Sequence, residues 1–319
     1  AEQGARILLS SHDFTGVPAD LEDQARAMRA TGARIIKIAV KASRLSDCLP
    51  LLSLGRTFDE AAPQRPVLIA MGEAGLATRI LAQRFNSAWT YAGAVRDVGQ
   101  ISVSKLLQQF RYRAVTARTD IYGLLGRPVA HSVSPAMHNA AFGAAGLDAV
   151  YLPLPAADAD DFLAFAEALG VAGASVTIPY KVALFERASE VDDLARRLGA
   201  VNTLKRGAHG WAARNTDVAG FLQPLWDRSV PMRGRRAAIL GAGGSARAVA
   251  VALAGEGAHV TVHARNTAQA EAVARLVGGE VGAFPPGDGS WDLLVNCTPI
   301  GMHPRVDQSP VQSSSLTRG

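Results

Sequence analysis

A glycine-rich turn that follows a buried apolar strand constrains the fold of this chain more than any other feature. Residues 236–240 read as a buried strand that runs into Gly241-Ala242-Gly243-Gly244-Ser245-Ala246 and then an alanine-rich helix through Leu253. Residues 259–263 read as a second strand. This order is the context of a dinucleotide site, because glycines let the backbone approach a pyrophosphate and the helix N-terminus offers free N–H groups. For the glycine run alone, an ordinary tight turn between strand and helix is the alternative.

The residues that follow the second strand favour NADP over NAD as the cofactor. An NAD site usually places an acidic side chain there, where it binds the ribose hydroxyls. This chain has Arg265, Asn266 and Thr267 instead. A guanidinium group at that point suits a 2′-phosphate, with which it forms charge-assisted hydrogen bonds. A solvated arginine at a strand end is the alternative interpretation.

Residues 1–115 repeat a rhythm of strand and helix. Apolar segments predict strands at 7–10, 34–40, 66–71 and 88–92, each followed by a helical segment, the last over 102–110. Four such units predict parallel strands with right-handed crossovers, and they amount to half of a (β/α)8 barrel. Residues 116–120 then read as a linker, 121–225 as a second α/β domain and 226–319 as the nucleotide-binding domain.

Composition and charge exclude several classes of protein. The chain is 48% hydrophobic and 19% charged, which is typical of a folded protein, and it has no apolar run of about 18 residues that would predict a membrane span. The net charge is +5 without a nucleic-acid-binding motif, so anionic small substrates are the expected partners. Cys48 and Cys297 lie far apart, which predicts neither a metal site nor a disulfide framework and favours a cytoplasmic location.

The second half of the chain resembles the shikimate dehydrogenase family from residue 121 to about 310. Motifs of that family occur in order at 131–135, 175–181, 199–203, 215–220, 241–244 and 296–302. The resemblance implies a substrate-binding α/β domain, a Rossmann domain for NADP, and reduction of 3-dehydroshikimate to shikimate. Quinate stays open as an alternative substrate.

The resemblance also assigns roles to individual residues. Lys181 would donate a proton to the substrate oxygen, and Asp217 would pair with the lysine and hold it in place. Taken alone, a surface lysine is the alternative for Lys181. Hydroxyl and amide side chains suit a polyol, because each can donate or accept. The further implied contacts are Ser132 and Ser134 with the substrate carboxylate, Thr177 and Asn202 with its hydroxyls, and Thr298 and Met302 with the nicotinamide.

Two features of these motifs leave alternatives open. Ser132 and Ser134 precede Pro135, so capping of a helix is a second interpretation of the two serines. Tyr180 stands where the family more often has histidine or phenylalanine.

The first half resembles the type I dehydroquinate dehydratases over residues 6–112. The motifs lie at 11–14, 37–40, 71–79 and 99–102. That family is a (β/α)8 barrel that forms an imine with its substrate. Lys37 shares one strand face with Ile35 and Ala39, and an inward barrel face would desolvate its amine, as a Schiff-base lysine requires. A lysine on a strand edge is the alternative.

Three other residues of the first half take roles from the same resemblance. His12 ends the preceding strand, where it would remove the α-proton and return a proton to the leaving hydroxyl. A packed strand-end histidine is the alternative. Arg79 would meet the substrate carboxylate and Gln100 a hydroxyl. The family usually has a serine shortly before the Gly-Gln pair, but residues 93–98 contain none.

The two halves together predict a bifunctional shikimate-pathway enzyme that converts 3-dehydroquinate to 3-dehydroshikimate and then to shikimate. Both parts read as truncated, the barrel at its start and the dehydrogenase at its end. One alternative is a dehydrogenase with an inactive barrel remnant. Another is a non-catalytic nucleotide-binding regulator, against which the presence of Lys181 and Asp217 argues. The oligomeric state is not readable from the sequence.

Overall fold

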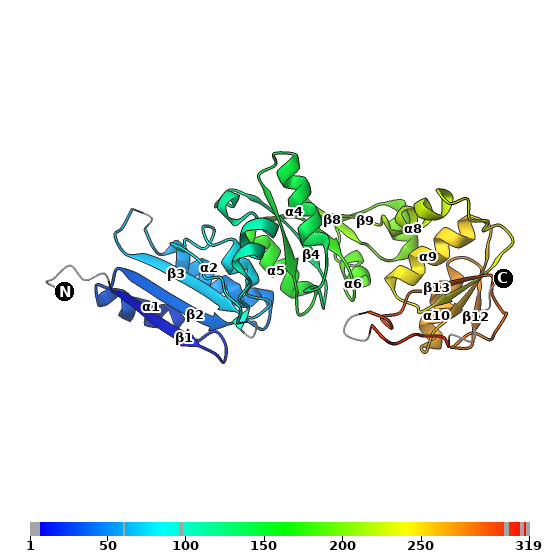
Figure 1. The fold of residues 1–319 in the computed structure, drawn as a ribbon, viewed down its shortest axis with the longest axis horizontal. Helices are drawn as coiled ribbons and strands as arrows, with labels where there is room; N and C mark the ends of the chain where they lie inside the picture. The colour runs from blue at the N-terminus through cyan, green and yellow to red at the C-terminus, as the bar shows by residue number, and fades with distance from the viewer. Residues whose placement is uncertain (1–6, 60, 96–97, 303–305, 313–315, 317–319) are drawn as a thin grey trace. The chain divides into compact units, whose positions relative to one another are not determined.

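The protein is described by a computed structural model that covers residues 7–59, 61–95, 98–302, 306–312 and 316. The chain forms two compact units, Ala1–Tyr180 and Lys181–Gly319 (Figure 1). Throughout the described ranges, every helix is too short or too polar to cross a membrane. The same ranges contain no group of three or more His, Cys, Asp or Glu side chains that could hold a metal ion.

The first unit begins with a three-stranded parallel sheet in the order β1-β2-β3. Apolar side chains of its strands and helices make the core, with Ile36, Leu51, Leu68 and Phe85 fully buried. The elements are β1 (Leu8–Asp13), α1 (Leu21–Ala30), β2 (Ile35–Lys41), η1 (Leu45–Cys48), α2 (Leu49–Arg56), β3 (Arg65–Met71) and α3 (Leu76–Ile80).

The strand predicted at 88–92 is wrong, since the structure has no strand over this segment. Ala88 N–H donates to the Pro66 carbonyl of β3 (2.9 Å), which starts a ladder. The carbonyl of Tyr91, however, accepts from the guanidinium of Arg79 (3.2 Å) and does not extend that ladder. The helix predicted at 102–110 is present from Val103 to Gln109, and its main part is the π-helical segment η3 (Lys105–Gln109).

The second part of the first unit is another parallel α/β layer, in which the strand order is β5-β4-β6. A buried amide, Asn139, bonds both main-chain groups of Tyr151 in β5: its Nδ2 donates to the carbonyl (2.9 Å) and its Oδ1 accepts from the N–H (2.8 Å). The elements are η4 (Tyr112–Ala114), β4 (Asp120–Leu125), α4 (Ser134–Ala144), β5 (Ala149–Leu154), α5 (Ala159–Leu169) and β6 (Val171–Val176).

The second unit starts with a small α/β segment. Strands β8 and β9 pair antiparallel, and β7 runs parallel to β9. The elements are α6 (Lys181–Phe185), β7 (Glu190–Val191), α7 (Asp193–Leu198), β8 (Thr203–Gly207), β9 (Gly210–Arg214) and α8 (Asp217–Trp226).

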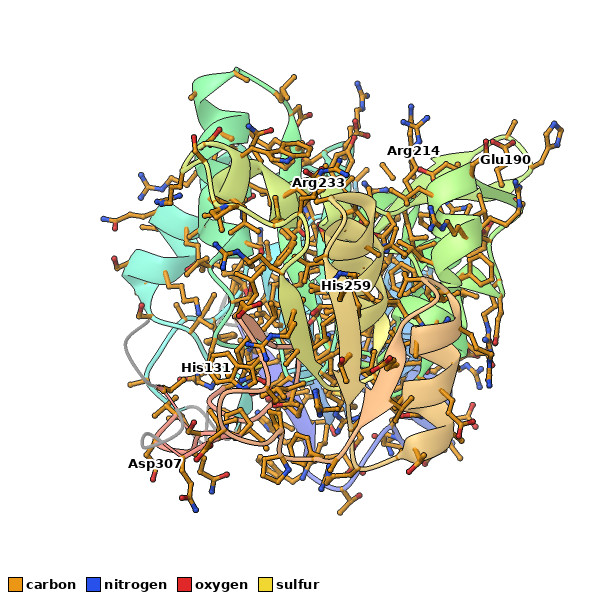
Figure 2. The ribbon with its side chains drawn as sticks, turned by 90° about the vertical axis from the view of Figure 1, so that its right-hand side faces the viewer. His131, Glu190, Arg214, Arg233, His259 and Asp307 are labelled. Atoms are coloured by element: carbon orange, nitrogen blue, oxygen red, sulfur yellow. The ribbon has the colours of Figure 1, made fainter. Side chains whose placement is uncertain are left out.

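The rest of the second unit is a four-stranded parallel sheet in the order β12-β11-β10-β13. Along the chain these are the third, second, first and fourth strands, which is the order of a doubly wound sheet, and ligands bind such sheets where the order reverses. Figure 2 shows this unit, with His259 at the start of β11. The elements are β10 (Arg236–Leu240), α9 (Gly244–Gly255), β11 (His259–His263), α10 (Thr267–Arg275), β12 (Glu280–Gly282) and β13 (Leu293–Asn296). The predicted Rossmann strands are confirmed.

Candidate active sites

A lysine–carboxylate pair lies at the starts of two helices of the second unit. Lys181 is the first residue of α6 and Asp217 the first of α8, and the Lys181 Nζ lies 2.5 Å from Asp217 Oδ2. The other carboxylate oxygen accepts from Asn202 Nδ2 (2.8 Å). The side chains are only 11% and 27% exposed, so the ion pair is largely shielded from water. The arrangement holds an ammonium group in one orientation.

Main-chain contacts fix the three segments that supply this pair. The Lys181 carbonyl accepts from Val201 N–H (2.9 Å), beside Asn202. The buried amide of Asn215 donates to the Ala200 carbonyl (2.9 Å) and accepts from Asp217 N–H (2.9 Å). Asn215 therefore joins the motifs at 199–203 and 215–220.

The glycine turn lies directly beside the ion pair. Lys181 Nζ donates to Ser245 Oγ at 3.4 Å, and a Cβ added at Gly244 would lie 3.0 Å from Lys181 Cβ. Gly241 has φ +107°, and a Cβ there would lie 3.0 Å from the Cys297 carbonyl oxygen. A Cβ at Gly243 would meet no atom within 4 Å, so the space beside the turn is open. A Cβ at Gly241 or Gly244 would thus be tightly placed, and Lys181, Asp217 and the turn lie close together.

The segment that follows β13 also contacts the glycine turn, because β13 pairs with β10 on the side opposite β11. Asn296 Oδ1 accepts from Thr298 N–H (2.9 Å) and from Thr298 Oγ1 (2.7 Å), which fixes the loop after the strand. Burial raises the pKa of Cys297 to about 12, so this thiol stays neutral. Met302 is exposed.

The residues at the end of β11 suit a phosphorylated dinucleotide. Arg265, Asn266 and Thr267 are all exposed, and Asn266 caps α10 by accepting from Gln269 N–H (3.1 Å). No acidic side chain follows β11 directly. An exposed guanidinium together with an open glycine turn fits NADP.

In the first unit, the residues assigned to the substrate lie at carboxyl ends of strands. Ser132 Oγ donates to Ser134 Oγ (3.1 Å) and accepts from Ser134 N–H (3.2 Å) at the start of α4. Thr177 follows β6, and its N–H donates to the Leu125 carbonyl at the end of β4 (2.8 Å). Ser132 therefore satisfies the N–H of the first residue of α4, although Val133, the N-cap residue of this helix, makes no side-chain cap hydrogen bond.

Tyr180 has a structural role at the end of the first unit. It is buried, and its hydroxyl donates to the Ala156 carbonyl (2.7 Å) in the loop between β5 and α5. This hydrogen bond accounts for a tyrosine at a position where other residues are more common.

The first half of the chain brings Lys37 and His12 together. Lys37 Nζ lies 2.9 Å from His12 Nε2 and 4.8 Å from the ring centre of Tyr91. Burial and the charge of Lys37 lower the pKa of His12 below its usual value of 6.5. A neutral imidazole in contact with an amine can accept a proton. Sequence reasoning missed Tyr91, whose aromatic ring in a presumed strand was the available signal.

Arg79 and Gln100 take part in main-chain contacts rather than facing open space. Arg79 is buried, and its guanidinium donates to the carbonyls of Tyr91 (3.2 Å) and Val98 (2.7 Å). Burial lowers its pKa to about 10. Within the described residues, its Nε has no hydrogen-bond partner. Gln100 Oε1 accepts from Val95 N–H (3.2 Å).

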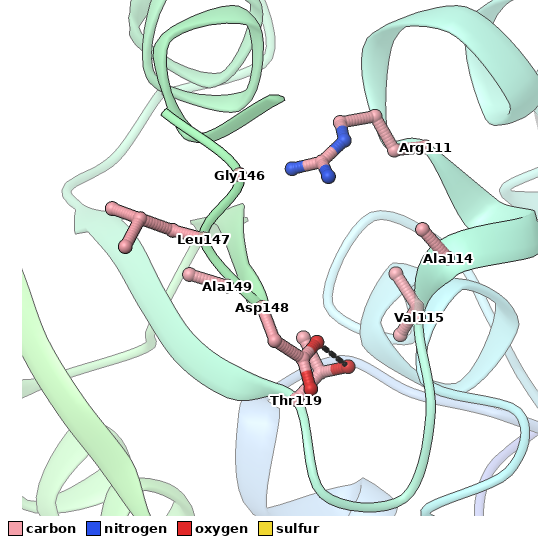
Figure 3. Close-up of a pocket in the computed structure, with 8 residues that line it drawn as sticks. All are labelled: Arg111, Ala114, Val115, Thr119, Gly146, Leu147, Asp148 and Ala149. Carbon is pink, nitrogen blue, oxygen red and sulfur yellow. Dashed lines mark hydrogen bonds between the residues drawn. The ribbon is translucent and has the colours of Figure 1, made fainter. Parts of the chain in front are cut away.

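A cavity of about 220 Å³ in the first unit lies away from all of these residues. Arg111, Thr119 and Asp148 line it, and Thr119 Oγ1 donates to Asp148 Oδ1 at 2.6 Å (Figure 3). None of the predicted site residues lines this cavity.

Comparisons with known proteins agree with the two-part organisation. A family model described as the shikimate dehydrogenase substrate binding domain matches residues 124–204, and one for type I 3-dehydroquinase matches residues 1–117. A shikimate dehydrogenase (NADP(+)) of a Nostoc species is 39% identical over 222 residues, covering 63% of this chain and 75% of the relative. A chloroplastic bifunctional 3-dehydroquinate dehydratase/shikimate dehydrogenase of Arabidopsis thaliana is 31% identical over 339 residues, covering 98% of this chain. The chain spans 55% of the length of that relative.

Solved structures give the same assignment. A shikimate dehydrogenase from Aquifex aeolicus has TM-score 0.57 and 32% identity, covering 63% of this chain and 77% of that one. A shikimate dehydrogenase in complex with NADP+ has TM-score 0.57 and 34% identity, covering 63% and 75%. The doubly wound sheet and its glycine turn, with the lysine–aspartate pair beside it, are the features of an α/β protein that binds a dinucleotide. With the sequence matches, the chain belongs to the shikimate dehydrogenase family, and its first 117 residues are similar to the type I 3-dehydroquinase model.

Proposed function

We propose that the second half of the chain interconverts 3-dehydroshikimate and shikimate with NADP as cofactor. The observation that carries this proposal is the shielded Lys181–Asp217 pair, 2.5 Å apart and beside Ser245 of the glycine turn. The names of the relatives support the substrate and the cofactor, since they are described as shikimate dehydrogenases (NADP(+)).

The residues of the pair would supply the proton of the reaction. NADPH, when bound, supplies the hydride that reaches the carbonyl carbon. The ammonium group of Lys181 gives a proton to the carbonyl oxygen, which becomes the new hydroxyl. Asp217 orients that ammonium group and stabilises its charge before the transfer. Asn202, on the other carboxylate oxygen, keeps Asp217 from rotating.

The remaining assigned residues would bind and orient the ligands. We propose that Ser132 and Ser134 bind the substrate carboxylate, and that Thr177 and Asn202 bind its hydroxyls. The N–H groups at the start of α9, around Ser245 and Ala246, would hold the pyrophosphate, and Arg265 the 2′-phosphate. Thr298 and Met302 would contact the nicotinamide.

A direct test is the oxidation of shikimate with NADP+, followed by the absorbance of the reduced cofactor. We expect turnover for the unaltered chain and none above background for Lys181→Met. Lys205→Met is the matched control, because Lys205 is an exposed lysine of the same unit, in β8. Equal rates in all three proteins would refute the role of Lys181. Quinate, assayed in parallel, distinguishes the alternative substrate.

We also propose that the first half dehydrates 3-dehydroquinate through an imine. The contact of Lys37 Nζ with His12 Nε2 at 2.9 Å supports this activity. The amine of Lys37 would condense with the ketone and release water. His12 would take the α-proton and return a proton to the departing hydroxyl, which leaves as water, and hydrolysis of the imine would restore the lysine. The net change is the loss of one water from the substrate.

Borohydride reduction in the presence of 3-dehydroquinate tests the imine. We expect covalent label on the peptide that contains Lys37 and no such label in Lys37→Ala. Lys41→Ala is the matched control, since Lys41 ends the same strand and is exposed. An unlabelled wild-type peptide would leave the dehydrogenase as the only activity, with an inactive barrel remnant.

We also propose that the protein is cytoplasmic and that it binds small molecules but neither nucleic acid nor membranes. The proposed domain limits lie at residues 115, 120 and 225. The two distant, unpaired cysteines are in keeping with a reducing compartment. A regulator that binds NADP without turnover is the remaining alternative, and the shikimate assay separates it from the enzyme.

A further inference from the structure

The carboxylate of Asp161 lies between the two parts of the first unit. Asp161 is in the first turn of α5, and its side chain is fully buried. Its oxygens accept from the N–H groups of Ser46 (2.8 Å), Leu45 (3.0 Å) and Ala157 (2.9 Å). Leu45 and Ser46 belong to η1, in the dehydroquinase-like segment, and are 116 and 115 residues distant in sequence.

Charge complementarity strengthens the same contact. Arg44 Nε donates to Asp161 Oδ1 (3.2 Å), and Arg44 Nη2 donates to the more exposed Asp158 (3.3 Å). Burial would raise the pKa of Asp161, but the hydrogen bonds from Ala157, Ser46 and Leu45 outweigh it and hold that pKa below its usual value. The carboxylate is therefore ionised at neutral pH, where a buried charge is stable only while its donors stay in place.

The donors stand at the start of a continuous helical segment. η1 and α2 together run from Leu45 to Arg56, and their first N–H groups lack partners within the helix. Such groups are usually satisfied by a side chain adjacent in sequence. Here the N–H groups of Leu45 and Ser46 are instead satisfied by Asp161 of α5, which is distant in sequence. The stability of this helix start therefore depends on docking.

This helix start closes the loop that follows the lysine strand. β2, which carries Lys37, ends at Lys41, and the next residue, Ala42, donates to the Met71 carbonyl of β3 (2.9 Å). Asp47 Oδ2 then accepts from the N–H groups of Ser43 (2.7 Å) and Arg44 (3.1 Å). The loop is thus held at both ends, by the sheet and by Asp161.

We propose that Asp161 is a docking residue that joins the dehydroquinase-like segment to the substrate-binding domain of the dehydrogenase and thereby stabilises the helix that starts at Leu45. Its carboxylate is the counterpart of the N–H groups at 45 and 46 and of the Arg44 guanidinium. The interface then fixes the loop that follows β2. This role does not depend on the activities proposed above.

Hydrogen exchange of the full chain, followed by mass spectrometry, tests the proposal with Asp161→Asn. This change keeps the size of the side chain but removes its charge and one acceptor oxygen. We expect amides of residues 45–56 to exchange on the order of ten- to hundredfold faster, with little change over β4 and β6. The matched control is Asp192→Asn, because Asp192 also caps a helix, accepting from Ala195 N–H (2.7 Å), but makes no contact of this kind with η1.

Two results would overturn the proposal. One is unchanged exchange over 45–56 in Asp161→Asn, and the other is an equal increase over 45–56 and over β4 and β6. Should Asp161→Asn fail to fold, Arg44→Gln serves as the milder variant, since Arg44 is partly exposed. For Arg44→Gln, faster amide exchange confined to residues 45–56, by less than the factor expected for Asp161→Asn, would support the docking role. Unchanged exchange over these residues would refute it.

Discussion

Replacement of Asp217 by asparagine is the sharpest perturbation of the proposed dehydrogenase site. The carboxylate accepts from Lys181 on one oxygen and from Asn202 on the other. An amide of the same shape has only one oxygen, so its NH2 group must face one of these two donors. The change therefore removes both the negative charge and one of the two hydrogen bonds that orient the ammonium group.

The distance within the pair sets the size of the effect. Coulomb's law gives an attraction of about 2 kcal/mol for unit charges 2.5 Å apart in water, and about 7 kcal/mol at an effective dielectric constant of about 20. The pair is partly shielded, so its attraction falls between these limits. Only the fraction of this attraction that orients the ammonium group of Lys181 lowers the activation barrier. We therefore expect kcat of Asp217→Asn to fall on the order of 100-fold, which corresponds to a barrier about 3 kcal/mol higher.

Initial rates of NADP+ reduction by shikimate measure this effect. Asp227→Asn is the matched control, because Asp227 directly follows α8 and its carboxylate accepts a hydrogen bond from Gln223 (2.9 Å) at the surface. Lys181→Met and the double variant complete a cycle, in which we expect the double variant to be no slower than Lys181→Met. A kcat within twofold of wild type for Asp217→Asn, or additive losses in the cycle, would refute the reasoning.

Three further changes test other parts of the two sites. Gly244→Ala places a Cβ 3.0 Å from Lys181 Cβ, so steady-state kinetics should show a kcat on the order of tenfold lower, with the lysine displaced. Arg265→Asp should lower kcat/KM with NADP+ on the order of 100-fold and raise it with NAD+, as measured with both cofactors. Because burial and the charge of Lys37 lower the pKa of His12, an NMR titration of this histidine should have its midpoint below pH 6.5. Dehydration needs the neutral imidazole. The dehydration rate should therefore persist below pH 6.5 and fall as the pH drops through the measured midpoint.

Each of these changes has its own control. Gly220→Ala in α8 adds a Cβ with no atom within 4 Å and should leave the kinetics unaltered. Arg228→Asp, an exposed arginine of the same unit, should not alter cofactor preference. In Lys37→Met the His12 midpoint should move upward, because the neighbouring positive charge is gone. A midpoint that stays the same would show that burial alone causes the lowered pKa.

Local signals in the sequence were enough to predict the nucleotide-binding sheet. The predicted strands at 236–240 and 259–263 have the bounds of β10 and β11. The first is an apolar run that ends at the glycine turn, and the second is rich in β-branched residues, which favour strands. The proximity of Lys181 and Asp217 was predictable only from the resemblance, since nothing in the two segments themselves indicates that they meet.

Contacts between distant segments were beyond the reach of the sequence. The segment at 88–92 has the composition of a strand, but the carbonyl of Tyr91 is taken by a buried arginine from α3. Asp161 reads as one of several acidic residues at a helix start, and its sequence context does not reveal its three N–H donors, two of them from η1. In both cases a side chain competes for main-chain groups, and such competition depends on the tertiary fold.

The amide of Asn139 has a consequence for how this protein behaves in concentrated solution. β5 is the outermost strand of its layer in the first unit, with β4 on one side only. By engaging both main-chain groups of Tyr151, the asparagine takes the place of a neighbouring strand at this point of the edge. Open strand edges are where sheets of separate molecules pair, so this side chain removes one attachment point for self-association.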